Sequence, residues 1–150
     1  MAGTAMSARE LKERIQRRAR QANLTLGPDL AQGLERYYLL LAKWNARVNL
    51  TSFALGPGGE EKSVDRLLLE PLAAARHIPL GSRTLLDAGS GGGSPAIPLK
   101  LALPHLSLRM VESKTRKAVF LREAVRELSL TDTQVETTRF EELLARPDLH

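Results

Sequence analysis

The segment that most constrains the fold is Leu-Leu-Asp-Ala-Gly-Ser-Gly-Gly-Gly-Ser-Pro, residues 85–95. A short apolar run ends in Asp87, glycines follow, and a second apolar segment begins after them. This order is typical of a buried strand that leads through a tight loop into a helix. Glycines supply positive φ angles and leave room for a molecule beside the backbone, and the start of the helix offers free N–H groups. The sequence therefore predicts an α/β fold with a ligand site at this loop.

The spacing of the glycines distinguishes between classes of ligand. Gly89, Gly91 and Gly93 form the pattern G-x-G-x-G. The dinucleotide-binding pattern G-x-G-x-x-G needs a sixth-position glycine, where this chain has Ser94. A nicotinamide-binding Rossmann domain is therefore the less favoured interpretation, and a glycine loop alone is often only a tight turn.

An acidic residue then follows the next predicted strand. The apolar stretch at residues 106–111 ends in Glu112, nineteen residues after Gly93. An acid at the tip of the second strand of a βαβ unit is placed to accept hydrogen bonds from two ribose hydroxyls. Enzymes that use S-adenosylmethionine share this order of elements: a strand, a G-x-G-x-G loop, a helix, a second strand and an acid. The sequence therefore predicts a site for that cofactor.

Composition excludes several other classes of site. The chain has no cysteine, so disulfides, thiolate metal sites and cysteine nucleophiles are excluded. Its three histidines, His77, His105 and His150, are too scattered to suggest a metal site, and we expect none. No apolar run approaches the ~18 residues of a membrane span, and the N-terminus lacks the apolar core of a signal peptide. We therefore expect a cytoplasmic protein that does not associate with membranes.

The net charge of +5 is concentrated near the N-terminus. Residues 1–50 hold nine Lys/Arg and four Asp/Glu, whereas the remaining hundred residues hold equal numbers of both. Arg14, Arg17, Arg18 and Arg20 cluster on one predicted helix. This asymmetry has two interpretations, contact with a polyanion such as nucleic acid or an ordinary solvated helix face.

Apolar periodicity and capping signals predict the order of the elements. The first helix opens with a capping box at Ser7 and Glu10, Pro71 should kink or interrupt the third helix, and Ser113 can cap the fifth. Residues 1–6 are expected to be disordered. The predicted helices cover residues 8–22, 28–48, 60–78, 97–102, 113–128 and 140–145, and the predicted strands cover residues 83–88, 106–111 and 133–138.

The second predicted helix has a strong amphipathic pattern. Its apolar positions follow a 4-3-4-3-4 spacing: Leu30, Leu34, Tyr37, Leu41, Trp44 and Val48. Tyr37 and Trp44 are therefore interpreted as core residues in preference to base-stacking platforms. Arg36, Lys43 and Arg47 lie outside the stripe and add to the basic surface.

Four stretches carry more specific motifs: L-A-K-W-N-A-R-V-N-L-T at residues 41–51, L-D-A-G-S-G-G-G-S-P-A-I-P-L at residues 86–99, Val111-Glu112-Ser113 with Lys117 and Phe120-Leu121, and Arg139-Phe140-Glu141. With them the chain resembles the bacterial small-subunit (16S) ribosomal RNA 7-methylguanosine methyltransferases, also called glucose-inhibited division protein B. The first two stretches are close to the family patterns L-x-K-W-N-x-x-x-N-L-T and D-x-G-S-G-A-G-F-P-G-I-P-L.

The resemblance implies a Rossmann-like class I methyltransferase fold in residues 81–150, preceded by a basic helical segment in residues 1–80. It also implies methyl transfer from S-adenosylmethionine to N7 of a guanine in small-subunit ribosomal RNA. The cofactor-binding residues expected on this basis are Asp87, Gly89, Ser90, Gly91, Gly93, Glu112, Ser113, Phe140 and Glu141. The residues expected to face RNA are Lys43, Arg47, Lys117 and Arg139. Guanine N7 carries a free lone pair, so no general base is required, and no catalytic residue is assigned.

The chain differs from the family at three points. Ser94-Pro95-Ala96 replaces Phe-Pro-Gly, and residues 66–72 lack the His and Ser of the pattern R-H-x-x-D-S-L. The sequence also stops after the third predicted strand, so only the 3-2-1 half of the family's sheet is expected. The first strand would then have an open apolar edge, which favours self-association. A non-catalytic remnant or RNA-binding module of the same family is the alternative function.

Overall fold

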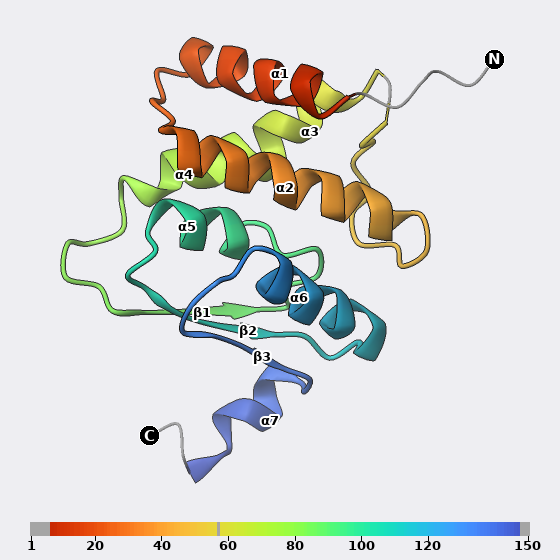
Figure 1. Cartoon of the computed structure of the whole chain (residues 1–150). Helices are drawn as coiled ribbons and strands as arrows, with labels where there is room; N and C mark the ends of the chain where they lie inside the picture. The colour runs from red at the N-terminus through yellow and green to blue at the C-terminus, as the bar shows by residue number, and fades with distance from the viewer. Residues whose placement is uncertain (1–6, 57, 148–150) are drawn as a thin grey trace.

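The computed structural model describes residues 7–56 and 58–147 (Figure 1). The predicted disorder of residues 1–6 concerns a segment outside these ranges. The elements are helices α1 (Ala8–Gln21), α2 (Pro28–Asn45), α3 (Glu60–Val64), α4 (Glu70–Ala75), α5 (Ala96–Ala102), α6 (Thr115–Glu127) and α7 (Phe140–Leu144), the π-helical turn η1 (Asp65–Leu69), and strands β1 (Thr84–Ala88), β2 (Ser107–Val111) and β3 (Thr133–Glu136). None of the described helices is long and apolar enough to cross a membrane.

The first helix begins at the predicted capping box. The Ser7 hydroxyl accepts a hydrogen bond from the Glu10 N–H at 3.1 Å, and the Glu10 carboxylate accepts one from the Ser7 N–H at 3.4 Å. Helix α2 begins with Pro28, whose fixed φ and missing N–H suit the first turn. The buried stripe of α2 is confirmed at Leu34, Tyr37 and Leu41.

Helix α2 ends at Asn45, three residues before the predicted end. The Asn45 side-chain oxygen accepts hydrogen bonds from the N–H groups of Leu50 at 2.7 Å and Thr51 at 3.0 Å. A side-chain acceptor that captures two later N–H groups competes with continuation of the helix. The L-x-K-W-N-x-x-x-N-L-T motif is therefore a helix stop with a fixed turn after it.

The third predicted helix is divided into three parts. Helix α3 passes into η1, in which the Glu70 N–H donates to the Asp65 carbonyl five residues earlier, and α4 follows. Pro71 has no N–H for the Leu67 carbonyl four residues before it, and its ring crowds that carbonyl in a regular helix. A wider π turn removes this clash. The predicted interruption at Pro71 is confirmed, and it takes the form of a π turn.

The three strands form a parallel sheet in the order β1-β2-β3. Leu85 pairs with Leu108 in register, and Leu108 pairs with Thr133. Helices α5 and α6 connect the strands, so the sheet is an incomplete Rossmann-like sheet preceded by helices, as predicted. In Figure 1, helices α1 to α6 lie on one side of the sheet and α7 on the other. The opposite side exposes Leu86, next to Arg109.

A single hydrophobic cluster joins the N-terminal helices to the sheet. It includes Ile15 of α1 and Leu34 of α2 together with Met110 of β2 and Phe120 of α6. Trp44 is only partly buried and packs its ring at a tilt against Phe120, with 5.8 Å between ring centroids. The helices before the sheet therefore share one core with it, and the division of the chain at residue 81 stays a prediction.

Candidate functional site

The glycine-rich loop is fixed at the C-terminal end of β1. The N–H groups of Gly89 and Ser90 both donate to the Val111 carbonyl at the end of β2, at 2.8 and 3.0 Å. The Gly93 N–H donates to the Ser90 carbonyl at 2.7 Å, which closes the loop before α5 begins. Gly89, Gly91 and Gly93 have φ angles of 71°, 53° and 90°. The three predicted glycines therefore all occupy conformations that side chains disfavour.

The glycines differ in what surrounds them. A Cβ at Gly89 would meet nothing within 4 Å, and one at Gly91 only the Gly89 carbonyl at 3.9 Å. A Cβ at Gly93 would lie 2.6 Å from the Ile97 Cδ1 atom and 3.3 Å from Leu121 Cδ2. Gly89 and Gly91 therefore face open space that a ligand can fill, whereas Gly93 lets the loop pack against the core.

Glu112 joins the glycine loop to the segment after β2. Its side chain is buried, and one carboxylate oxygen accepts a hydrogen bond from the Gly91 N–H at 2.9 Å. The other oxygen accepts one from the Lys114 N–H at 2.8 Å. A carboxylate has about four acceptor positions, so each oxygen retains capacity for a hydroxyl donor. The acid predicted from its spacing therefore lies directly against the loop.

Asp87 orders the loop from the inside. The buried Ser90 hydroxyl donates to the Asp87 carboxylate at 2.6 Å and lies 3.1 Å from the Asp87 carbonyl. Burial raises the pKa of the Asp87 carboxyl above its ordinary value, and the Ser90 hydrogen bond partly opposes this shift. Both residues stabilise the shape of the loop, whether or not they also touch a ligand.

The residues after β3 lie at the same end of the sheet. The Glu112 N–H donates to the Glu136 carbonyl at 2.9 Å, and parallel strands end at a common edge. Arg139 occupies the N-cap position of α7 without a side-chain capping hydrogen bond, Phe140 is half-buried and Glu141 is exposed. Arg122 of α6, which no sequence motif indicates, donates to the Val135 carbonyl at 3.0 Å and the Thr137 hydroxyl at 2.8 Å. This arginine fixes the segment that leads to α7.

The prediction that Ser113 caps α6 is wrong. Lys114 is the N-cap residue, and its side chain makes no capping hydrogen bond. The Lys114 N–H donates to the Glu112 carboxylate at 2.8 Å, which fixes the residue before the first turn of α6. Ser113 itself is exposed.

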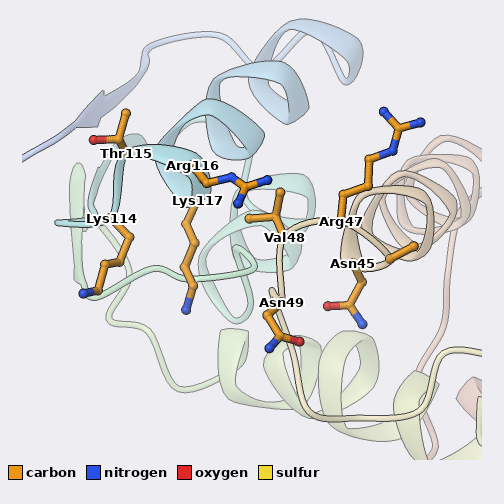
Figure 2. A pocket seen from close by; sticks show the side chains of 9 residues that line it. Asn45, Arg47, Val48, Asn49, Lys114, Thr115, Arg116 and Lys117 are labelled. Atoms are coloured by element: carbon orange, nitrogen blue, oxygen red, sulfur yellow. The ribbon is translucent and has the colours of Figure 1, made fainter.

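An open groove of about 680 Å³ runs between the end of α2 and the start of α6 (Figure 2). Figure 2 shows Lys114, Arg116 and Lys117 from the α6 side and Arg47 with two asparagines from the α2 side. The lining residues are Asn45, Ala46, Arg47, Val48, Asn49, Lys114, Thr115, Arg116 and Lys117. We call this the basic groove; the structure thus brings together the predicted RNA residues Arg47 and Lys117.

A second groove of about 580 Å³ shares Arg47, Val48 and Arg116 with the basic groove and adds Lys43 and Trp44. Arg139 lines neither groove. Within residues 7–56 and 58–147, no ion pair within 4 Å involves the side chains of Lys43, Arg47, Lys114, Arg116 or Lys117. None of these cations is neutralised by a carboxylate of the described residues at ion-pair distance, although Glu123 and Glu127 also line the second groove.

The arginines of α1 are arranged differently. Arg14 lies 3.8 Å from the Glu60 carboxylate, Arg17 lies 3.6 Å from that of Glu61, and Arg18 forms a two-pronged pair with Asp65. The Asp65 hydrogen bond raises the pKa of Arg18 above its usual value. These side chains bind α3 and η1, so much of the N-terminal charge excess is balanced within the fold. Arg17 and Arg20 are exposed, which fits a solvated helix face.

The family model and the similar proteins found by comparison carry the same description. Residues 30–150 match the family model described as rRNA small subunit methyltransferase G. Similar proteins of that name come from Chromobacterium violaceum (41% identity over 81% of this chain and 56% of the relative), Stenotrophomonas maltophilia (42%, over 81% and 55%) and Neisseria gonorrhoeae (36%, over 88% and 61%). The chain therefore spans somewhat more than half the length of the curated relatives it matches.

Proposed function

The chain belongs to the GidB family of rRNA small subunit methyltransferases G, and from this premise we propose that it binds S-adenosylmethionine at the glycine-rich loop. We further propose that the whole protein methylates N7 of a guanine in small-subunit ribosomal RNA. The observation that carries the cofactor proposal is the Glu112 carboxylate, which lies 2.9 Å from the Gly91 N–H at the C-terminal edge of the sheet. Ligands bind at this edge in open α/β sheets.

In this proposal every predicted cofactor residue except Ser113 is given a role. Glu112 would accept hydrogen bonds from the ribose hydroxyls, and the open faces of Gly89 and Gly91 would lie against the nucleoside. The backbone at Phe140 and Glu141 would flank the adenine. Asp87, Ser90 and Gly93 would hold the loop in shape, and Ser113 lies beside Glu112 in sequence.

The chemistry requires alignment more than proton transfer. When bound, S-adenosylmethionine supplies an electrophilic methyl group. Guanine N7 has a lone pair in the plane of the ring, so the chain's residues need to orient the base and exclude competing geometries. Orientation alone can contribute up to ~7–11 kcal/mol to such a reaction. Arg139, at the same sheet edge, is proposed to face the substrate or cofactor.

We propose that the basic groove binds the RNA backbone. Five cations line the two adjoining grooves: Lys43 of α2, Arg47 just after it, Lys114 just before α6, and Arg116 and Lys117 of α6. A polyanion releases counterions when it pairs with such cations, which makes binding sensitive to salt. The first N–H groups of a helix such as α6 have no helical carbonyl to donate to, and such groups favour phosphate.

Charge removal in the basic groove tests the RNA proposal. The double substitution Arg47→Gln and Lys117→Gln is expected to reduce the slope of log affinity against log salt concentration by about two, roughly one for each lost phosphate contact. The control is Arg9→Gln with Arg17→Gln, which removes the same charge from exposed, ion-paired positions on α1. Filter binding to a small-subunit RNA fragment measures both slopes. Equal slopes for the two double variants would refute the RNA role of the groove.

Transfer of a labelled methyl group tests the activity. Label from S-adenosylmethionine should enter small-subunit RNA and be recovered as 7-methylguanosine after digestion. Salt-sensitive RNA binding without incorporation would support the alternative, a non-catalytic RNA-binding module of the same family. We also propose that the protein works in the cytoplasm, where ribosomal RNA is found.

We propose that the chain can associate with a second copy of itself through β1. One edge of β1 pairs with β2, and its other edge has no strand partner among the described residues.

A further inference from the structure

A buried tyrosine connects helix α2 to the glycine loop. The Tyr37 side chain is fully buried, and its hydroxyl donates to the Gly92 carbonyl at 2.6 Å. Burial, and then the nearby charge of Asp87, raises the pKa of the Tyr37 hydroxyl, so it remains a donor. A buried hydroxyl is costly without a partner, and its partner here belongs to the loop that faces the ligand.

The loop also rests closely on α2 and the turn after it. A Cβ at Gly92 would lie 3.0 Å from the Leu50 carbonyl oxygen and 3.2 Å from the Leu41 Cδ1 atom. The Asn45 side-chain oxygen fixes the position of Leu50 by accepting a hydrogen bond from the Leu50 N–H. The helix stop of α2 therefore provides the surface against which the loop backbone packs.

A second hydroxyl anchors the end of the loop. The Ser94 hydroxyl donates to the Leu67 carbonyl of η1 at 2.8 Å. This is the carbonyl that lies four residues before Pro71, which has no N–H to donate to it. The loop is thus held at Gly92 by α2 and at Ser94 by η1, both of which precede the sheet in sequence.

We propose that Tyr37 and Ser94 are positioning residues for the cofactor loop, so that the N-terminal helices form the back wall of the cofactor site. This inference rests on the proposed function, because it takes S-adenosylmethionine as the ligand of the loop. A loop that is already held in its binding shape loses less conformational freedom when the ligand arrives. Neither hydroxyl touches the ligand in this account, and each acts through the backbone of the loop.

The neighbouring residue offers a matched control. Tyr38 lies on the same helix and is also buried, and its hydroxyl donates to the Leu55 carbonyl at 3.2 Å, away from the glycine loop. Tyr37→Phe and Tyr38→Phe therefore remove the same atom and the same type of hydrogen bond. We expect both to lower the melting temperature. Only Tyr37→Phe should weaken binding of S-adenosylhomocysteine, by about tenfold, the size expected for one lost hydrogen bond to a buried carbonyl.

Amide hydrogen exchange without ligand gives a second measurement. The amides of Gly91 and Gly93 should exchange faster in Tyr37→Phe than in Tyr38→Phe, and Ser94→Ala should show the same increase. If the wild-type chain is folded and does not bind S-adenosylhomocysteine, the proposed cofactor fails, whereas the exchange rates still decide whether Tyr37 holds the loop. Equal affinity and equal exchange in the two tyrosine variants would overturn the positioning role.

Discussion

Replacing Glu112 by glutamine is expected to weaken the binding of S-adenosylhomocysteine by about tenfold to a hundredfold, although the two side chains have nearly the same size. One Glu112 oxygen accepts a hydrogen bond from the Gly91 N–H, and the other accepts one from the Lys114 N–H. A glutamine has one oxygen, so its NH₂ group must face one of these donors. A lost hydrogen bond to a charged group costs about 1.5–3 kcal/mol, which is tenfold or more in affinity.

Isothermal titration calorimetry measures this loss of affinity. Thermal unfolding of the same variant shows how much of the loss arises because the folded state is less stable. Glu13→Gln is the matched control, because Glu13 is exposed on α1 and pairs only with Arg9 in the described structure. The control should bind the ligand as the wild type does. Wild-type affinity in the Glu112→Gln variant would exclude Glu112 from the cofactor site.

Gly93→Ala is expected to lower the free energy of unfolding by about 2–5 kcal/mol. Its φ of 90° disfavours a side chain, which costs about 1–2 kcal/mol. The new Cβ would also lie 2.6 Å from Ile97, which is fully buried beside Leu121, and overpacking of this kind costs about 1–3 kcal/mol. Gly81→Ala isolates the backbone cost, because Gly81 has φ 88° and nothing lies within 4 Å of its Cβ position.

The same glycine series separates folding from binding. Gly89→Ala should lose only about as much stability as Gly81→Ala, since nothing lies within 4 Å of its Cβ position. We expect it to abolish cofactor binding, because the methyl group occupies the space proposed for the nucleoside. Chemical denaturation gives the stabilities and calorimetry gives the affinities. Unchanged affinity in Gly89→Ala would show that the ligand does not approach this glycine.

The parts of the site that could be predicted are those whose geometry is encoded locally. Positive φ angles at Gly89 and Gly91 require glycine, so the residue type reveals the backbone conformation. The placement of Glu112 follows from the length of one strand–helix–strand unit, which fixes where β2 ends. The order β1-β2-β3 follows from the same alternation of strands and helices.

The parts that could not be predicted depend on contacts between distant segments. Periodicity marks Tyr37 as a core residue but does not reveal that its hydroxyl meets Gly92, fifty-five residues later. Counting charges cannot show that Arg18 pairs with Asp65, forty-seven residues away. The early end of α2 depends on which acceptor the Leu50 N–H meets, Asn45 in place of a helical carbonyl.

A titration of the chain with S-adenosylhomocysteine, followed by the amide NMR resonances of Gly91 and Lys114, tests the central claim most directly. These are the two residues whose N–H groups donate hydrogen bonds to the Glu112 carboxylate. We expect saturable binding in which both resonances shift together. A folded chain that does not bind the ligand, or shifts confined to Arg47 and Lys117 in the basic groove, would contradict it.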